Sequence, residues 1–356
     1  MASSTMNNLM SNEIKQYITP ESLKRDFDGS ISSSSTAIHV IQWNVLAQAL
    51  SYTKGNFVRV NDDVVDFEKR KWRILEQIIV RRPDLCALEE MDIFNCFLEN
   101  ELPKYGYTCF FVPKINSKCF LFEADTKNFK GADGTLLCYK TDLFNELSRS
   151  GEQLPNDGRR EAQGADGTLL CYKTDLFNEL SRNGEQLPDD GRRETQIFAV
   201  LHLEHKPSSK KIVFIGTHFK SKKEFKTSRL HQAEAIIEYL KTKYPTSSHV
   251  ILAGDFNGDF EEPCYIELVN FGLKSAYRIK MGDQEPSYTT WTYKGRDGTE
   301  REQCKAIDYV FYSPKGFTPK AILQLPSKDD IGPNALPSIN YSSDHLALEV
   351  VLNIEQ

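Results

Sequence analysis

Acidic, amide and imidazole side chains recur where apolar strands of this chain are predicted to begin or end. A strand predicted at 248–253 leads into Gly254, and Asp255 and Asn257 follow two positions apart. Residues i and i+2 of an extended chain point the same way, so both side chains can face one pocket. A carboxylate beside an amide can hold a water, a metal or a phosphate. The same residues also suit a simple turn, and the motif alone leaves both interpretations open.

Similar residues lie at the ends of other predicted strands. They are Asn44, Glu90, Asp92, His218, Asp308, Asp344 and His345. Polar groups gathered at one rim of packed sheets form a single pocket on a rigid scaffold. Because the recurring types are only Asn, Asp, Glu and His, we interpret this rim as one candidate site.

An oxygen-rich set with histidine and no thiolate suits a hard divalent ion, Mg²⁺ or Mn²⁺. Glu90 is the best single candidate ligand, because it is well placed at the end of a strand predicted at 84–88, which runs into Glu89-Glu90. Mg²⁺ typically keeps several waters and is held by one or two carboxylates together with substrate phosphates. The pattern therefore predicts a magnesium-dependent centre, with an ordinary surface acid as the alternative for Glu90.

The remaining rim residues fit the hydrolysis of a phosphoester. A water must attack phosphorus in line while the charge on the phosphate oxygens is stabilised. We expect Asp255 to take the proton of that water and Asn257 to hold the water or a phosphate oxygen. His218 and His345 can donate to phosphate, and Asp308 can fix the tautomer of His345. A structural role is the alternative for either histidine taken alone.

Lysines are concentrated directly after His218. Four of them lie within residues 220–226, ahead of a helix predicted to begin near residue 227. The N-terminus of a helix favours anions, because its backbone N–H groups lack partners within the helix. A solvated loop is the alternative. We interpret the cluster as a binder of anionic substrate, with Lys220 and Lys222 as its leading members.

The bulk composition limits the fold and the partners. With 356 residues, 40% hydrophobic and 11% aromatic, the chain can form one large α/β domain or two average ones. A net charge of −6 gives no broad basic field, so a polyanion must be met by a local cluster of cations. The eight cysteines form no C-x-x-C pair, which is typical of reduced, packed cysteines. No apolar stretch is long enough for a predicted membrane span.

A disordered polar leader is predicted for residues 1–37 and one catalytic domain for residues 38–356. Helices are predicted at 66–82, where Asp66 can cap the first turn, and at about 227–241. The leader lacks the apolar segment of a signal peptide and has few arginines for a transit peptide, so the predicted location is the cytoplasm. The oligomeric state does not follow from the sequence.

A 33-residue block occurs twice in tandem, at 131–163 and 164–196, and the copies differ at only three positions. Two copies are too few for a solenoid. Each copy contains one predicted strand, at 134–140 and at 167–173. A fold built for one copy must loop out the other or add it at a sheet edge. We therefore predict that one copy is superfluous.

The rim residues lie in motifs that resemble the endonuclease/exonuclease/phosphatase superfamily over about residues 38–353. These motifs are, in order, Gln42-Trp43-Asn44, Glu89-Glu90-Met91-Asp92, Thr217-His218, Gly254-Asp255-Phe256-Asn257, Ile307-Asp308-Tyr309 and Ser343-Asp344-His345. The stretches 43–48 and 287–291 are similar to the nocturnin branch, which is next to the carbon-catabolite-repression deadenylases. The resemblance implies a metal-dependent phosphoesterase with a four-layered α/β sandwich, in which two packed mixed β-sheets are flanked by helices.

The same resemblance implies a role for each rim residue. It implies that Glu90 is the magnesium ligand, with Asn44 nearby. It places Asp255 and Asn257 around the attacking water. Around the phosphate it places His218 and His345, with Asp308 supporting His345. It also implies that Lys114, at the end of the Phe110-Phe111-Val112-Pro113-Lys114 stretch, contacts the substrate.

The chain departs from the family's pattern at three places. Glu89 stands where glutamine is usual, which adds a negative charge near the metal. Lys222 stands where nocturnins carry an arginine, and lysine lacks the bidentate grip of arginine on phosphate. The family's Asp-Gly strand beside the site is the duplicated segment, so Asp133 and Asp166 are both candidates for its aspartate.

For the activity, the resemblance implies release of the 2′-phosphate from NADP⁺ or NADPH. A 3′-exoribonuclease acting on poly(A) RNA is the closest alternative, although a long anionic strand favours a wider basic track and stacking aromatics. A catalytically inactive binding adaptor is the alternative from another class. It predicts loss of a key acid or histidine, and none is missing. Mitochondrial import is the family-based alternative to the cytoplasm.

Overall fold

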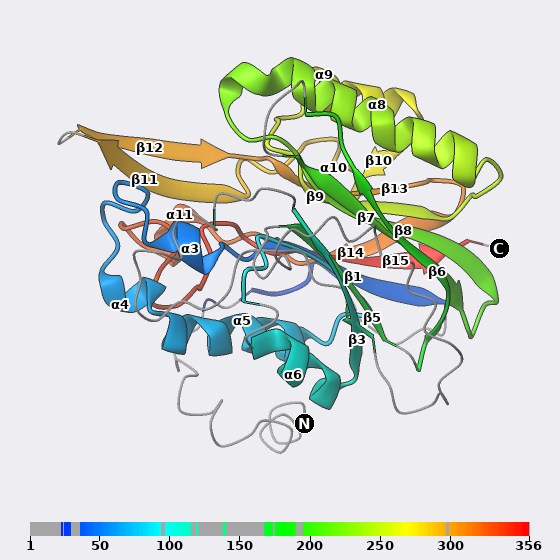
Figure 1. Cartoon of the computed structure of the whole chain (residues 1–356), viewed down its shortest axis with the longest axis horizontal. Helices are drawn as coiled ribbons and strands as arrows, with labels where there is room; N and C mark the ends of the chain where they lie inside the picture. The colour runs from blue at the N-terminus through cyan, green and yellow to red at the C-terminus, as the bar shows by residue number, and fades with distance from the viewer. Residues whose placement is uncertain are drawn as a thin grey trace, which may run out of the picture.

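The computed structural model describes residues 23, 25–29, 36–93, 97–114, 119, 138–139, 167–173, 175–189, 195–296 and 299–355. In this part of the chain two mixed β-sheets face each other, with helices on their outer faces (Figure 1). The arrangement confirms the predicted α/β sandwich of two packed mixed sheets flanked by helices.

The first sheet has the strand order β14-β15-β1-β2-β5-β3-β4. Its strands, in chain order, are β1 Ala37–Asn44, β2 Leu85–Glu89, β3 Tyr107–Pro113, β4 Cys138–Tyr139, β5 Gly167–Lys173, β14 Phe317–Ile322 and β15 Leu348–Ile354. The central pair β1 and β2 is parallel, and β15 is antiparallel to β1.

The second sheet has the strand order β10-β13-β9-β8-β7-β6. Its strands are β6 Phe177–Gln186, β7 Ile197–His205, β8 Lys210–His218, β9 Val250–Asp255, β10 Lys274–Ser275 and β13 Asp308–Tyr312. Here β8 and β9 are parallel, and β13 is antiparallel to β9. A separate hairpin, β11 Thr290–Arg296 and β12 Thr299–Lys305, projects from the body of the molecule (Figure 1).

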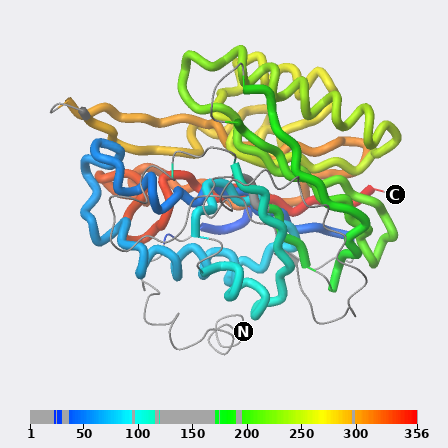
Figure 2. The backbone as a smooth tube through the Cα atoms, viewed as in Figure 1, coloured from blue at the N-terminus to red at the C-terminus, as the bar shows by residue number. Residues whose placement is uncertain are grey.

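Helices cover both outer faces of the sheets, as the backbone trace shows (Figure 2). The first sheet is covered by α5 and α6, and the second by α8 and α9 (Figure 1). The α-helices are α3 Gln48–Ser51, α4 Asp62–Val65, α5 Phe67–Arg81, α6 Glu99–Glu101, α8 Lys226–Lys243, α9 Pro263–Asn270, α10 Ala276–Lys280 and α11 Lys328–Ile331. In this part of the chain none of them is long and apolar enough to cross a membrane.

Helix α5 forms where the sequence predicts a helix. The Asp66 side chain accepts a hydrogen bond from the backbone N–H of Lys69, which satisfies one of the free donors of the first turn. Ile74 and Ile78, four residues apart, are fully buried against the first sheet. The helix ends at Arg82, whose φ of 51° is left-handed. The second predicted helix is also present, as α8.

Two regions of apolar packing hold the layers together. One fills the space between the sheets and under α5, and it includes fully buried Trp43, Leu88 and Phe214. The other lies between the second sheet and helices α8 and α9, with Ile236 and Leu252 among its members. Each fully buried side chain of this size contributes about 1.5–3 kcal/mol relative to exposure. The sheets are therefore a rigid support for the residues at their rims.

The second copy of the duplicated block supplies strands to both sheets, β5 to the first and β6 to the second. Its strand β5 pairs with β2 on one side and β3 on the other, with Cys171 opposite both Cys86 and Cys109. Of the first copy, only Cys138 and Tyr139 are described, as β4 at the end of the strand order. The candidates Asp133 and Asp166 lie outside the described residues.

Some details differ from the sequence-based expectations. Cys109 is disulfide-bonded, so the prediction of reduced cysteines is wrong for this residue, whereas Cys86 and Cys171 are free thiols. Within the predicted leader, the buried Arg25 side chain donates to the carbonyl of Ala347 at 2.8 Å. The domain boundary at residue 38 stays a prediction.

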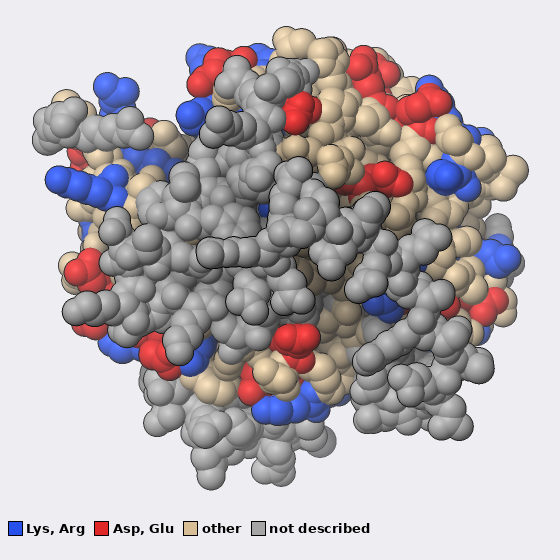
Figure 3. Space-filling model, in the orientation of Figure 1, with Lys and Arg blue, Asp and Glu red and all other residues tan. Residues whose placement is uncertain are grey.

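Acidic and basic side chains are interspersed on the face shown in Figure 3.

Candidate active site

Three candidate residues of the second sheet meet at one edge. His218 and Asp255 are the last residues of the parallel strands β8 and β9 and are register partners. Asp308 begins the antiparallel strand β13, directly opposite Asp255. Gly254 permits this close pairing, because a Cβ at that position would collide with the carbonyl oxygen of Thr217. Strand order and direction thus bring the three side chains together.

The first sheet supplies the facing residues in the same way. Asn44 ends β1 and pairs with Glu89, the last residue of the parallel strand β2, so Glu90 emerges beside it. His345 precedes the antiparallel strand β15, whose first residue pairs with Gln42. The indole of Trp43 donates to the carbonyl of His345 at 2.8 Å. The site is therefore built from both sheets.

Asn44 connects the carboxylates of the two sheets. Its Nδ2 donates to Oε1 of Glu90 and to Oδ2 of Asp255, each at 3.0 Å. Its Oδ1 accepts from the backbone N–H of Leu46 at 3.1 Å, which directs the amide nitrogen toward the acids. The same Asp255 oxygen lies 3.5 Å from Nε2 of His218. Oδ2 of Asp255 is thus the point where these side chains converge.

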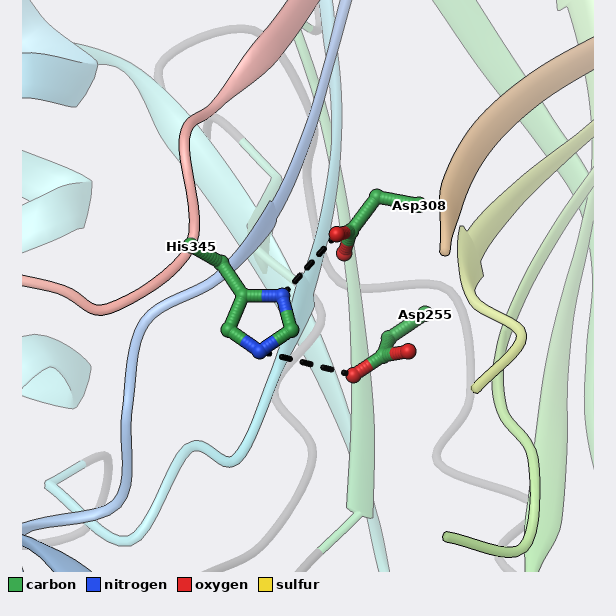
Figure 4. Close-up of side chains that lie close together, drawn as sticks. All are labelled: Asp255, Asp308 and His345. Carbon is green, nitrogen blue, oxygen red and sulfur yellow. Dashed lines mark hydrogen bonds and ion pairs between the residues drawn. The ribbon is translucent and has the colours of Figure 1, made fainter. Parts of the chain in front are cut away.

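The imidazole of His345 lies between two carboxylates (Figure 4). Its Nδ1 is 2.9 Å from Oδ2 of Asp308, and its Nε2 is 3.9 Å from Oδ2 of Asp255. The Thr289 hydroxyl donates to the same Asp308 oxygen at 2.6 Å. Asp308 therefore orients the imidazole, and Thr289 orients Asp308. Thr289 lies in the stretch 287–291, but the role of its hydroxyl does not follow from the sequence, because only the fold brings it to Asp308.

Burial and neighbouring charges shift the proton affinities of this group. Burial, followed by the charge of Asp308, raises the pKa of Asp255 to about 7. Burial disfavours the charged imidazole of His345, but the carboxylates of Asp308, Asp344 and Asp255 outweigh it and raise its pKa well above its usual range. Near neutral pH, the centre therefore combines a titrating carboxyl group with a protonated histidine.

Glu89 differs from the expectation of an added negative charge. Its carboxyl group is fully buried, and Oε2 accepts from Nε2 of Gln42 at 2.8 Å. The same Gln42 nitrogen donates to Oδ1 of Asp308 at 3.1 Å. Burial raises the pKa of Glu89 well above its usual range, which favours the neutral acid. The glutamate thus stands close in charge to the glutamine usual at this position.

Glu90 and its neighbours form a second acidic group beside the site. Glu90 Oε2 accepts from the backbone N–H of Ala47 at 3.0 Å, and Glu90 has a left-handed φ of 59°. Asp92 is buried and accepts from the backbone N–H of Ala49 at 2.8 Å. Burial raises the pKa of Asp92 to about 7, and the fully buried Arg70 opposes this shift. A strained backbone at Glu90 is characteristic of functional sites.

Asn257 follows Asp255 with a left-handed φ of 51°. Its backbone N–H donates to Oδ1 of Asp255 at 2.9 Å, and its side-chain Nδ2 donates to the carbonyl of Phe219 at 3.1 Å. One hydrogen of the amide is thus used by the protein. The other hydrogen and Oδ1 remain the groups through which Asn257 would hold a water or a phosphate oxygen.

The predicted substrate lysines lie around the same edge. Lys220 and Lys222 follow His218, and Lys220 is half-buried whereas Lys222 is exposed. Lys114 is buried directly after β3. Because β2 and β3 are both antiparallel to β5, they run in the same direction, and Lys114 emerges at the same edge as Glu90. The fold thus gathers all three lysines at the rim that carries the acids.

The donor set fits a divalent cation. One ligand atom from each of Asp255, Asp308 and His345 lies within 4.8 Å of the others. Burial raises the pKa of Asp255 and of Asp92, because each carboxylate loses the solvation of its negative charge, and a cation would compensate that charge. Oxygen and imidazole donors without a thiolate suit a hard ion.

Comparisons with known proteins agree with this architecture. The model of the Endonuclease/Exonuclease/phosphatase family matches residues 41–345. Nocturnin of Xenopus laevis is 33% identical over 338 residues, which cover 92% of this chain and 76% of that protein. The human Nocturnin catalytic domain with bound sulfate matches with a TM-score of 0.68 at 25% identity, covering 95% of this chain and 99% of that one. The CCR4-Not complex 3′-5′-exoribonuclease subunit Ccr4 of Debaryomyces hansenii is 21% identical over 92% of this chain and 40% of that protein.

Proposed function

The chain belongs to the endonuclease/exonuclease/phosphatase family and is a phosphoesterase or nuclease, and we propose that it is a Mg²⁺-dependent phosphatase that converts NADP⁺ or NADPH to NAD⁺ or NADH. The observation that carries the proposal is the convergence of Asn44, His218 and His345 on Oδ2 of Asp255. A single carboxylate oxygen thus faces an amide and two imidazoles in a buried centre.

Each of these groups has a task in phosphate-ester hydrolysis. Asp255, with a pKa of about 7, takes a proton from the attacking water once it is ionised. His345 is held in one orientation by Asp308, and its raised pKa keeps it able to donate to a phosphate oxygen. His218 offers a second donor, and Asn257 orients the water or a phosphate oxygen. Together they place proton donors and an acceptor around one phosphorus atom.

The metal would be held by Glu90, with Asn44 nearby and Asp255 completing the acidic surroundings. When bound, Mg²⁺ or Mn²⁺ supplies charge neutralisation to the phosphate oxygens. Oδ2 of Asp308 and Nδ1 of His345 would stay joined to each other at 2.9 Å. The Asp308–His345 pair then acts as an oriented acid, and Asp308 is not required as a metal ligand.

The preference for a small nucleotide over RNA rests on charge and on similarity. A net charge of −6 favours a compact anion that meets a few lysines over a long strand. Human Nocturnin, a structural relative, has a bound sulfate, an anion that resembles phosphate in shape and charge. We propose that Lys114, Lys220 and Lys222 bind the substrate. A 3′-5′ exoribonuclease acting on poly(A) is the second candidate, supported by the name of the more distant Ccr4 relative.

The test is to incubate the purified protein with Mg²⁺ and, separately, with NADPH and with a short oligo(A), measuring free phosphate and RNA length. Asp255→Asn and Glu90→Gln proteins run alongside, because both changes keep side-chain shape while removing the charge. We expect phosphate from NADPH with the unaltered protein, at least 100-fold less with either variant, and none after chelation of the metal.

The other outcomes discriminate between the alternatives. Shortened RNA without phosphate release from NADPH would refute the phosphatase proposal and support the exoribonuclease. Inactivity of the folded protein on both substrates would refute both activities and favour the binding adaptor. The cytoplasmic location and its mitochondrial alternative stay predictions from the sequence.

A further inference from the structure

A fully buried arginine lies next to the site without touching the residues that carry its chemistry. Arg229 is on α8, and its guanidinium makes two bonds to one carboxylate. Nε donates to Oε2 of Glu262 and NH2 donates to Oε1, each at 2.8 Å. Glu262 immediately precedes α9 and is also buried. The pair therefore fixes the start of α9 against α8 with two parallel hydrogen bonds.

The third nitrogen of this guanidinium holds the segment that follows His218. NH1 of Arg229 donates to the carbonyl of Lys220 at 2.9 Å and to that of Lys222 at 2.8 Å. We refer to residues 219–222 as the lysine loop. One buried side chain thus connects two helices with the loop that carries two candidate substrate-binding lysines.

The lysine loop is also tied directly to the catalytic strand end. The backbone N–H of Phe219 donates to the carbonyl of Asp255 at 2.8 Å, and the Phe219 carbonyl accepts from Asn257 at 3.1 Å. The backbone N–H of Lys220 donates to Oε1 of Gln232 on α8 at 3.0 Å. Gly258 packs on the pair itself, because a Cβ there would lie 2.8 Å from Oε2 of Glu262. Loop, pair and catalytic turn form one connected structure.

The loop is held in a conformation that it would not adopt alone. Lys222 has φ 79° and ψ 146°, a region that residues with a side chain seldom occupy. Such a conformation is strained and persists only where surrounding contacts impose it. The bond from Arg229 to the Lys222 carbonyl is such a contact.

We propose that Arg229, oriented by Glu262, is a positioning residue that holds the lysine loop so that its cations and His218 meet the substrate phosphate together. The proposal deepens the function proposed above and rests on it for the identity of the substrate. A purely structural ion pair is the competing interpretation. The two differ in whether the effect of removing the pair depends on Lys220 and Lys222.

The test replaces the pair by Arg229→Met together with Glu262→Met. Exchanging a buried ion pair for apolar residues of similar volume is often neutral for stability, whereas removing one partner leaves a buried unpaired charge. Arg229→Lys is the second variant, because lysine keeps the charge but cannot make the forked contacts. Lys241→Ala, an exposed change at the far end of α8, is the control. Melting temperatures establish that each protein is folded.

We expect the double methionine variant to raise the KM for NADPH about tenfold while kcat changes less than about threefold, since the loop acts in binding. The same pair is then replaced in a Lys220→Ala, Lys222→Ala background, where we expect the KM to change less than about twofold. Equal effects in the two backgrounds would show that the pair does not act through the lysines and would overturn the proposal. An unchanged KM in the first background would overturn it as well.

Two further measurements do not require NADPH hydrolysis. Hydrogen exchange of the Phe219 and Lys220 amides should be accelerated at least tenfold in both pair variants and unchanged in Lys241→Ala. Calorimetry with inorganic phosphate should show the same loss of affinity as the KM. If the unaltered protein fails to hydrolyse NADPH, the proposed function fails, while unchanged exchange and phosphate affinity in the variants would refute the positioning role separately.

Discussion

Replacing Thr289 by valine should impair catalysis without touching any residue assigned to substrate, water or metal. The Thr289 hydroxyl donates to Oδ2 of Asp308 at 2.6 Å and accepts from the backbone N–H groups of Ile307 and Asp308 at 3.1 and 3.2 Å. Valine has almost the same shape, so the packing is kept and the hydroxyl is lost. Oδ2 of Asp308 would then keep His345 as its partner but lose the contact that fixes its direction.

The magnitude follows from the type of bond that is lost. A hydrogen bond to a charged group in a buried site contributes about 1.5–3 kcal/mol. If this energy is expressed fully in the transition state, kcat falls about 10- to 100-fold, since each factor of ten corresponds to about 1.4 kcal/mol. Two backbone N–H groups also lose an acceptor, which lowers the free energy of unfolding by about 1–3 kcal/mol for each group that stays unsatisfied.

The assay is steady-state release of phosphate from NADPH, with thermal unfolding of the same samples. Thr289→Ser is the matched control, because serine keeps the hydroxyl and loses only a methyl group, and it should stay within about threefold of the unaltered protein. A folded Thr289→Val protein with unchanged kcat would refute the idea that Thr289 orients Asp308. Equal impairment of the serine and valine variants would show that packing matters and the hydroxyl does not.

Three further predictions concern the duplicated block, a titrating helix residue and the substrate lysines. Deleting 131–163 or 164–196 gives products that differ at only three positions, and we expect both products to be soluble. The product that lacks 131–163 should be more stable by about 1 kcal/mol in melting experiments, because it keeps the Asn183–Tyr239 and Thr195–Asp189 hydrogen bonds. Insolubility of both products would contradict this. Burial raises the pKa of Glu76 to about 7, so its contribution to stability is present below the unfolded pKa and is lost as pH rises toward 7. Glu76→Gln should therefore stabilise by about 1 kcal/mol at pH 8, after allowance for partial exposure, and not at pH 4; equal denaturation midpoints at pH 8 would contradict it. Lys222→Arg should lower the KM for NADPH about threefold or more through bidentate phosphate contact, and a raised KM would oppose a role of this position in binding phosphate.

The meeting of the rim residues could be predicted because their positions follow from local sequence. A strand that ends at a polar residue is visible as an apolar run, and parallel strands bring their carboxyl ends to one edge. Asn44, His218 and Asp255 are examples, and the structure places them in contact. The helix at 66–82 was predictable for a similar reason, since its cap and its apolar spacing lie within one segment.

The supporting residues could not be predicted, because the contacts through which they act leave no pattern in the local sequence. Thr289 reaches Asp308 from a different loop, and Arg229 holds the lysine loop through carbonyl groups that have no sequence signature. The protonation preference of Glu89 could not be predicted from the sequence either. A glutamate is expected to be negatively charged at neutral pH, and only the burial of Glu89 next to Gln42 and Asp308 indicates that its neutral form is favoured.

The duplicated block shows a different limit. The copies are nearly identical, so local sequence gives either one the same propensity for the strand between β2 and β3. The two copies differ in the segment that follows each of them. Gln196, the last residue of the second copy, leads directly into β7 and donates to the carbonyl of His218 at 2.8 Å. The corresponding Gln163 is followed by the start of the second copy. Position along the chain, and not composition, makes the second copy supply β5 between β2 and β3, while the described residues of the first copy form β4 at the end of the strand order.

The two halves of the site belong to different sheets, so the activity depends closely on how the two sheets are aligned. Asn44 and His345 come from the first sheet, whereas Asp255 and Asp308 come from the second, with contacts of 2.9–3.0 Å between them. Close-packed apolar layers keep most of their burial if one slides by a fraction of an ångström, but hydrogen bonds of this kind weaken steeply. We therefore expect heat, denaturant or a distant substitution between the sheets to abolish the activity under conditions in which the protein is still folded.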